Sequence, residues 1–441
     1  MLRKVLLTFS TRTLTAFLSV INVLIGTNYL GVEGYGTISL IILGVTIYLL
    51  IQNLLTGSSI VYFQNKIPIS SIIQISYLWV IVSVIGFAGL IYGVDFFANL
   101  FHFDFEIVPQ EYALHNILLA SGYGLLNIHI NILLGRERIK AYNAIFFMQH
   151  AIASLFLILF FVVLGKNELF YYLIALYASY FLSFIVSFSL TYQYFRDIKL
   201  PSFTDFKSML NYGILGQGAN VFQLINYRLS YYLVDIFVGR ASLGVFSAAT
   251  QMSEGLWILG KSIGTVQFAR ISNSTDREYA RQISLKLFKI TVLITAIPLF
   301  LFTILPITFY TNLLGPEFEP VRGLVRWLAL GTISLTGSML FSHYFSGTGR
   351  IGKNTMASGI GVIITLLFGF SIVPILGVAG AALVTSLSYF TSLCYYIVQF
   401  KKEATLHLND IVLTKFEIKE AINLIFKRKP GNNMKPGSYQ D

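Results

Sequence analysis

Charged residues and cysteine are scarce in this sequence. Asp, Glu, Lys and Arg make up 12% of its 441 residues, whereas hydrophobic residues make up 55% and the mean hydropathy is +0.71. Soluble proteins carry roughly 25% charged residues, so this composition excludes an ordinary soluble protein. The single cysteine, Cys394, lies in an apolar run and excludes a disulfide framework.

Motifs that would mark an enzyme are missing as well. The sequence has no glycine-rich phosphate-binding loop, no nucleophile elbow and no zinc-ligand spacing. The histidines of the apolar runs at 112–134 and 144–164, which are His115, His129 and His150, are not spaced as metal ligands. We therefore predict that the protein is not an enzyme and binds no metal or cofactor.

Apolar segments dominate the chain instead. About 20 apolar residues suffice to cross the hydrocarbon of a bilayer. We predict an all-α polytopic membrane protein with twelve transmembrane helices. The expected spans are 5–30, 34–61, 71–94, 112–134, 144–164, 169–194, 209–238, 243–268, 285–310, 321–345, 356–378 and 381–400.

The basic residues divide unevenly between the connections. Of the 31 Lys and Arg, only Lys166, Arg240 and Arg322 fall in or at the edge of loops on the side opposite the N-terminus, and four lie well inside spans. Because Lys and Arg concentrate in cytoplasmic loops, both termini are expected in the cytoplasm. This placement also accounts for the net charge of +11 without nucleic acid, since the basic loops would face the inner leaflet.

The two halves of the chain repeat each other. Gly31, Gly36 and Ser39 after the first span recur as Gly239, Gly244 and Ser247 after the seventh, and weaker matches follow spans four and ten and lie in spans six and twelve. Six helices per half give both halves the same orientation, related by an axis along the membrane normal. We expect an N-lobe over 1–200 and a C-lobe over 201–400, which begins with an interfacial helix over 201–211 capped by Thr204 or Asp205. A basic cytoplasmic tail over 401–441 carries an amphipathic helix at 409–426.

Polar side chains line up inside several spans. A charge at membrane depth normally faces a bundle interior or a wet cavity. At helical spacing these residues share faces, which predicts a polar pathway between helices. The first span carries Arg12 and Asn22 on one face, the seventh carries Gln217, Arg228 and Asp235 with Asn220 beside them, and the eighth carries Glu254 and Lys261.

Positive charge outnumbers negative charge within the spans. The bases are Arg12, Arg228, Lys261 and Arg326, and the acids are Asp235 and Glu254. The surplus favours an anion, above all a phosphate or pyrophosphate, which arginine binds bidentately. Three alternatives stay open: Arg228 pairs with an acid, Arg326 reaches the membrane surface, or Asp235 or Glu254 couples transport to a proton or Na⁺.

Four stretches carry a family resemblance. They are Tyr29–Gly36, Phe237–Ala249, Leu314–Leu330 and Gly377–Ala382. In order and spacing they resemble bacterial polysaccharide exporters, the Wzx-type O-antigen flippases of the MATE-like multidrug/oligosaccharidyl-lipid/polysaccharide (MOP) superfamily. Two positions depart from that family, because Asn28 stands where an arginine is frequent and Ser230 where an acid is frequent.

The resemblance implies a V-shaped pair of lobes around a cationic cavity that alternates its access. It implies a flippase in the bacterial inner membrane that moves undecaprenyl-pyrophosphate-linked oligosaccharide repeat units for O-antigen, capsule or exopolysaccharide biosynthesis. Its partners would be membrane lipids, a polysaccharide polymerase and a chain-length regulator. In the site that we expect, Arg12, Arg228 and Lys261 hold the pyrophosphate in a cationic cavity that also includes Arg326, and Asn22, Gln217 and Asn220 contact sugar.

Other functions remain open at this point. A MATE-type multidrug or cation antiporter would need an acid in the first half, and the first six expected spans hold none well inside. A lipid II flippase usually has two further helices. A membrane glycosyltransferase, polymerase or ligase would need a large outer loop, whereas the longest expected here is 95–111.

Overall fold

The chain is built from α-helices. The computed structural model describes residues 2–102, 105–195, 201–272 and 276–403, and no strand occurs in these ranges; the expected tail helix at 409–426 lies outside them. The helices are α1 (Leu2–Thr56), α2 (Ser58–Phe63), α3 (Ile69–Phe101), α4 (Ala113–Gly135), α5 (Ile139–Leu157, extended by a π-helical turn at Ile158–Val163), α6 (Leu169–Thr191), α7 (Phe203–Val238), α8 (Arg240–Gly255), α9 (Trp257–Ser272), α10 (Arg277–Ile304), α11 (Ile307–Leu314), α12 (Val321–Gly347) and α13 (Gly352–Glu403).

Two of these helices are each a pair of membrane spans. α1 turns at Gly31, whose φ is 67°, and α13 turns at Gly377, whose φ is 58°. Glycine adopts positive φ without the steric cost that other residues meet, so both hairpins turn where the sequence supplies it. Among the described residues, eight helices are long and apolar enough to cross a membrane, and the two hairpins count double. With α7 and the α8–α9 pair, the predicted twelve crossings are confirmed.

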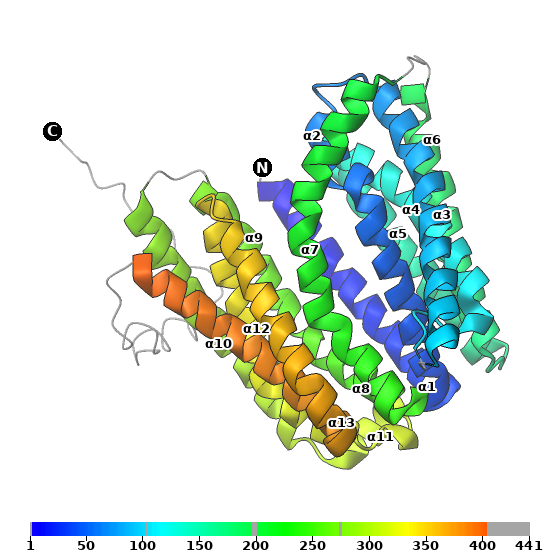
Figure 1. Ribbon diagram of the computed structural model, residues 1–441, viewed down its shortest axis with the longest axis vertical. Helices are drawn as coiled ribbons and strands as arrows, with labels where there is room; N and C mark the ends of the chain where they lie inside the picture. Colours follow the sequence, from blue (N-terminus) through cyan, green and yellow to red (C-terminus); the bar gives the residue numbers. More distant parts are fainter. Residues whose placement is uncertain (1, 103–104, 196–200, 273–275, 404–441) are drawn as a thin grey trace.

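The helices form two bundles arranged as a V (Figure 1). One bundle contains α1 to α6 and the other contains α8 to α13. They meet where α1, α8, α11 and α13 turn, which we call the closed end, and diverge toward the N-terminus, which we call the open end. This shape confirms the predicted V-shaped architecture.

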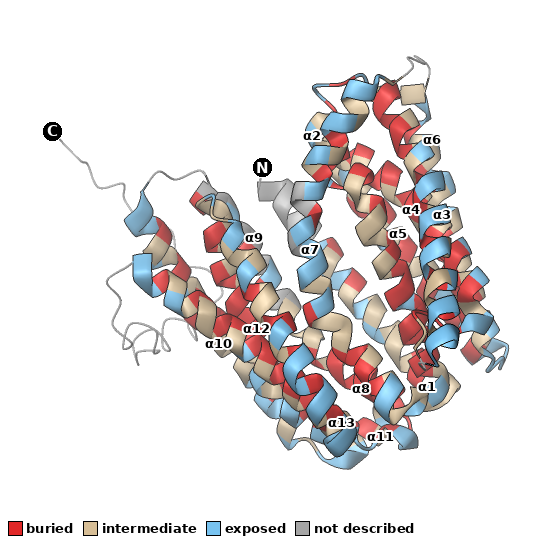
Figure 2. Ribbon diagram, viewed as in Figure 1, coloured by how far each residue is buried: buried red, intermediate tan, exposed pale blue. Residues whose placement is uncertain are grey.

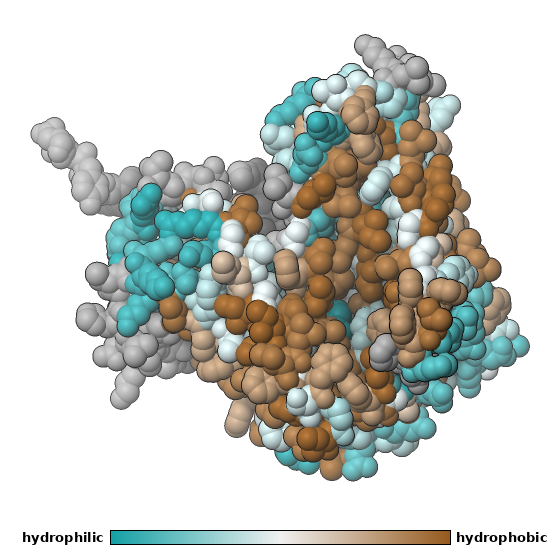
Figure 3. All heavy atoms as spheres, in the orientation of Figure 1, coloured by the Kyte–Doolittle hydropathy of each residue, from teal (hydrophilic) through white to brown (hydrophobic). Residues whose placement is uncertain are grey.

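The outward faces of the bundles are apolar. Figure 2 shows exposed residues along the outer side of α3, and these include Leu78, Ile81 and Ile85. In Figure 3 apolar side chains cover the middle of both bundles, while polar ones gather toward the ends. An apolar surface of this extent would promote aggregation in water, but it suits contact with lipid.

α7 contacts both bundles in turn. Near its start, the ring of Tyr212 stacks on Tyr62 with centroids 4.3 Å apart. Farther along, Asn226 Oδ1 accepts a hydrogen bond of 2.5 Å from Ser388 of α13. The separate interfacial helix expected over 201–211 was wrong, because these residues lead directly into one continuous helix. Its N-cap is Ser202, whose hydroxyl accepts from the Asp205 amide at 3.0 Å, rather than Thr204 or Asp205 itself.

α3 is longer than the sequence suggested. It continues to Phe101, so Asp95 lies inside a membrane helix and not in the loop expected over 95–111. Asp95 is 7% exposed, and neither of its carboxylate oxygens has a hydrogen-bond partner in the described part of the chain. The N-terminal bundle therefore contains a buried acid that the sequence had seemed to lack.

Small residues bring the bundles together at the closed end. Ser39 and Ser247, which the internal repeat pairs with each other, form a hydrogen bond of 2.8 Å across the interface. A Cβ atom on Gly244 would lie 1.7 Å from the carbonyl oxygen of Val32, and one on Gly36 would lie 2.3 Å from that of Arg240. Glycine at both positions thus permits backbone-to-backbone contact between α1 and α8.

We expect Gly244→Ala to separate the bundles at the closed end, because its methyl group has no room beside the Val32 carbonyl. Cysteines placed near this interface should react faster with a membrane-impermeant maleimide than in the parent protein. Gly323→Ala is the matched control, since a Cβ there meets nothing within 4 Å. Equal labelling of the Gly244→Ala and Gly323→Ala proteins would contradict this account of the interface.

Candidate functional site

A cavity of about 530 Å³ lies between α1 on one side and helices of the C-terminal half on the other. The second half of α1 contributes one wall, and α7, α9, α12 and α13 contribute the rest. The lining residues are Thr46, Leu49, Leu50, Asn53, Gln217, Asn220, Gln223, Leu224, Asn226, Tyr227, Trp257, Lys261, Leu335, Ser338, Met339, Ser342, His343, Ala357, Ser358, Tyr389, Ser392 and Tyr396.

The cavity lining is polar, aromatic and basic. It includes five side-chain amides and four large aromatic rings, and its basic residues are Lys261 and His343. No Asp or Glu occurs among the lining residues that the structure describes. The cavity can therefore offer amide hydrogen bonds, ring faces and positive charge, but no carboxylate to balance a cation.

Three of the residues predicted from the sequence line this cavity. Asn220 Nδ2 donates to Gln217 Oε1 at 3.0 Å, and Gln217 Nε2 donates to the carbonyl of Asn53 at 3.5 Å. Lys261 is exposed on α9. Gln217 and its contact with Asn53 thus join α7 to α1 across one corner of the cavity.

Arg12 belongs to the first bundle but acts across the gap. Its guanidinium lies 3.6 Å from the centroid of the Phe146 ring and donates to the Tyr142 hydroxyl at 2.6 Å. Arg12 is not among the residues that line the cavity, but its positive charge acts electrostatically on Lys261 of α9.

Arg228 is already balanced by an acid. Its two terminal nitrogens donate to the two carboxylate oxygens of Glu254 at 3.1 and 2.8 Å, and the guanidinium lies 5.0 Å from the centroid of Tyr231. Arg228 is not among the residues that line the cavity. Of the alternatives left open by the sequence, internal pairing is the one found, so Arg228 contributes little to the surplus of positive charge.

The remaining predicted residues lie apart from the cavity. Asn22 accepts a hydrogen bond of 2.6 Å from Ser154 within the first bundle. Arg326 is exposed, and its Nε donates to the Thr303 carbonyl at 2.9 Å. Neither residue lines the cavity, so the geometry does not place Asn22 against sugar or Arg326 against pyrophosphate.

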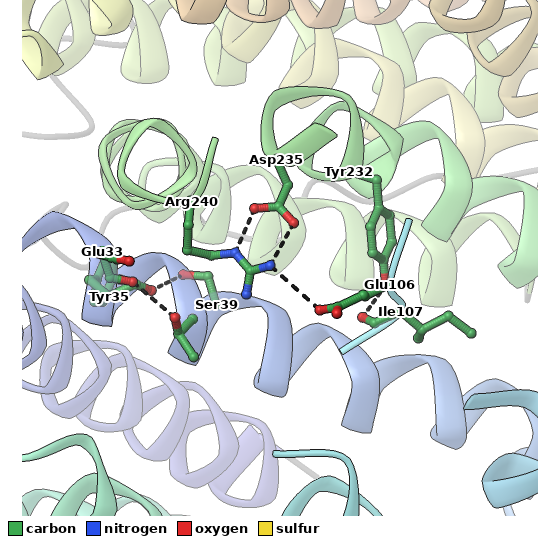
Figure 4. Close-up of polar contacts among 9 residues, drawn as sticks. Glu33, Tyr35, Ser39, Glu106, Ile107, Tyr232, Asp235 and Arg240 are labelled. Carbon is green, nitrogen blue, oxygen red and sulfur yellow. Dashed lines mark hydrogen bonds and ion pairs between the residues drawn. The ribbon is translucent and has the colours of Figure 1, made fainter. Parts of the chain in front are cut away.

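Asp235 is part of a polar cluster at the closed end (Figure 4). Arg240 pairs with Asp235 at 2.6 Å and also lies 3.9 Å from Glu106 in the segment between α3 and α4. Tyr232 donates to the carbonyl of Ile107 at 3.0 Å. These contacts hold α7 and α8 against the first bundle. Coupling of transport to an ion by Asp235 or Glu254 stays a prediction, since both acids are paired with arginine here.

Sequence reasoning missed the aromatic part of the cavity. Tyr227, Trp257 and Tyr389 come from α7, α9 and α13, and aromatic residues are so common in this chain that none stood out. One signal was available, because Trp257 directly follows the break between α8 and α9 within what looked like a single span. Interrupted membrane helices often supply binding sites in transporters.

We expect Glu254→Gln to lower the free energy of unfolding by about 3–5 kcal/mol, because it leaves the guanidinium of Arg228 charged and unpaired in a mostly buried position. The double variant Arg228→Gln/Glu254→Gln should recover most of this loss. Thermal unfolding of the purified proteins in detergent measures the stability of the single and the double variant. Arg326→Gln is the control and should change stability by less than about 0.5 kcal/mol. A Glu254→Gln protein as stable as its parent would show that the pair is not formed.

Comparison with known proteins identifies the fold. No protein-family model matches the chain. The uncharacterized membrane protein MJ1068 of Methanocaldococcus jannaschii is 26% identical over 132 residues, which is 29% of this chain and 26% of that protein. The similarity thus spans about a quarter of that relative's length.

Solved structures align over nearly the whole chain. The lipid II flippase MurJ in an inward closed conformation has a TM-score of 0.72 at 16% identity, over 96% of this chain and 91% of that one. A multidrug resistance MATE transporter of the MOP superfamily scores 0.68 in its inward-facing conformation, at 16% identity over 88% of this chain and 94% of that one. An outward-facing MATE structure scores 0.62, at 16% identity over 91% and 93%. The chain therefore has the fold that MOP superfamily flippases and transporters share.

Proposed function

We propose that this protein is a flippase that moves a lipid-linked oligosaccharide across a membrane by alternating access. The observation that carries the proposal is the cavity lining, which combines Lys261 and His343 with amides and aromatic rings and contains no acid among the described residues. The positive charge at the cavity would attract a phosphate group, and the amides would form hydrogen bonds with a saccharide. A lipid tail would stay in the bilayer while the head group occupied the cavity.

The substrate we propose is an undecaprenyl-pyrophosphate-linked repeat unit for O-antigen, capsule or exopolysaccharide. Support comes from the family resemblance of the turns and from the fold shared with a lipid II flippase. The family resemblance implies a bacterial inner membrane, and the distribution of Lys and Arg favours both termini in the cytoplasm. The open end would then face the cytoplasm, and a polymerase and a chain-length regulator would act on the far side.

Alternating access would use the two ends of the V in turn. The contacts of Arg240, Tyr232 and Ser39 hold the closed end together in the present conformation. Breaking them while the open end closes would expose the cavity on the other side. α7 contacts both bundles, so its early part must slide or bend as they move.

We expect Arg12→Ala and Lys261→Ala each to slow flipping of an undecaprenyl-pyrophosphate-linked saccharide in proteoliposomes by roughly ten- to hundredfold, since a hydrogen bond to a charged group is worth about 1.5–3 kcal/mol. Lys261→Arg should retain most activity because it keeps the charge. Arg326→Ala is the matched control outside the cavity. Normal flipping by both alanine variants would refute the assignment. Faster flipping of lipid II than of the oligosaccharide lipid would move the function to peptidoglycan synthesis.

A cation antiporter is the second candidate, and Asp95 is the observation that favours it. This acid is buried in the N-terminal bundle with neither oxygen hydrogen-bonded to a described residue, and MATE transporters share the fold. An isolated buried carboxylate is a common site for binding a proton or a cation. The cavity itself argues against a cationic cargo, because Lys261 and His343 line it.

The two candidates differ in one cellular measurement. As a flippase, the protein should leave the susceptibility of its host to cationic dyes unchanged, and Asp95→Asn should have no effect on that susceptibility. As an antiporter, expression should raise dye resistance at least several-fold and Asp95→Asn should abolish the increase. The minimum inhibitory concentration of ethidium distinguishes the flippase from the antiporter. Asn99→Ala, on the same helix as Asp95, is the control.

A further inference from the structure

We propose that Tyr227, Trp257 and Tyr389 form a saccharide subsite that stacks on a sugar ring and selects sugars by charge, accepting neutral, N-acetylated or acidic rings and rejecting rings with a free amine. We call these three residues the aromatic wall. The inference rests on the proposed function and names the part of the substrate that this side of the cavity recognises.

The aromatic wall is a continuous surface made by three helices. The ring centroids of Tyr227 and Trp257 lie 5.4 Å apart at an interplanar angle of 64°, and those of Tyr227 and Tyr389 lie 5.6 Å apart at 85°. Edge-to-face pairs of this kind hold each other's orientation. All three residues line the cavity, and Trp257 is only partly buried.

Side-chain amides run beside the aromatic wall. Gln217, Asn220 and Gln223 recur every third residue along α7, and all three line the cavity. Gln223 Nε2 donates to the hydroxyl of Tyr227 at 2.8 Å, which ties this stripe to the wall. An amide offers both donors and an acceptor, as the hydroxyl groups of a sugar require.

Two hydroxyl groups of the cavity lining, one of them in the aromatic wall, lack partners among the described residues. Tyr389 is 4% exposed and Ser338 is 6% exposed, and neither hydroxyl has a hydrogen-bond partner among the residues that the structure describes. Buried polar groups normally have partners, so an unpaired pair beside a cavity indicates groups that gain them when the site is occupied or closes. Both residues lie on the cavity lining.

An ion pair supports the wall from behind. Arg228 directly follows Tyr227 on α7 and pairs with Glu254 of α8, and neither charged residue lines the cavity itself. The Arg228–Glu254 pair is bidentate and therefore fixes its own geometry. The pair joins α7, which carries Tyr227, to α8, and this structural role accounts for charges inside the membrane that do not line the cavity.

Charge selection follows from what surrounds the wall. The basic lining residues are Lys261 and His343. Among the described lining residues none is acidic, so a protonated amino group on a sugar would meet repulsion without compensation. Acetylation removes that charge, and a carboxylate would be attracted.

The volume also fits a saccharide. At about 530 Å³ the cavity falls within the roughly 300–1,000 Å³ of small-ligand pockets, which is space for a few rings and not for a long chain. Flipping would then require one repeat unit at a time, and the stacked ring would be one of those near the pyrophosphate.

The test compares two lipids in proteoliposomes, bare undecaprenyl pyrophosphate and the same lipid carrying one N-acetylglucosamine. We expect the parent protein to flip the sugar-bearing lipid at least tenfold faster at limiting concentration. Trp257→Ala should reduce this ratio to near one while bare lipid still moves, and Trp257→Phe should keep most of it. Trp327→Ala, in an exposed position outside the cavity, is the matched control. An unchanged ratio in Trp257→Ala would overturn the subsite.

A second lipid, carrying glucosamine with its free amine, tests selection by charge. We expect it to move at least tenfold more slowly than the N-acetylated lipid at neutral pH, and Lys261→Gln should narrow the difference. Equal rates for the two lipids in the parent protein would overturn charge selection.

Binding without transport separates this inference from the proposed function. With Trp79 and Trp327 replaced by phenylalanine, Trp257 is the remaining tryptophan of the three, so its fluorescence reports on the wall in detergent. Quenching by a soluble N-acetylglucosamine trisaccharide, together with failure to flip any lipid, would uphold the subsite and refute the flippase. If the protein flips bare and sugar-bearing lipid at equal rates and the trisaccharide does not quench its fluorescence, the flippase is upheld and the subsite is refuted.

Discussion

A charge inside a membrane must be compensated, and this constraint organises the molecule. Arg228 is balanced by Glu254, and Arg240 by Asp235. Arg12 lies on an aromatic face and a tyrosine hydroxyl. Lys261 is the one of these charged residues that lines the cavity between the bundles. The charges therefore divide into ion pairs that hold helices in place and the cations, Lys261 and Arg12, that we propose meet a ligand.

The same constraint explains why the two ends of the V differ. At the closed end, glycines let α1 and α8 touch through their backbones, and short polar contacts such as Ser39 to Ser247 satisfy the groups buried there. Toward the open end the bundles separate, and amides and aromatic rings line the space between them. Apolar packing seals the closed end as well, because Tyr35 and Leu40 of α1 belong to one buried hydrophobic cluster with Leu243 and Phe246 of α8.

Much of the architecture was readable in the sequence. The twelve spans follow from apolar length, the hairpin at Gly31 from the need for positive φ, and the pairing of Ser39 with Ser247 from the internal repeat. Segment length was the weaker signal. Asp95 was assigned to a loop because a charge ended the apolar run, yet α3 continues past it by six residues to Phe101. The hydropathy of a segment does not show whether tertiary packing will bury one of its charged residues, so it does not predict that the helix continues past that residue.

For the site, the sequence by itself determined that basic residues outnumber acids within the spans and that Gln217, Asn220 and Lys261 lie on inward faces. Helical periodicity fixes which face a residue occupies. Only the tertiary structure decided that Glu254 pairs with Arg228, that the charge of Arg12 acts on Lys261, and that Trp257 belongs to the cavity. Those outcomes depend on the angle and distance between helices far apart in the chain, which periodicity within one helix does not encode.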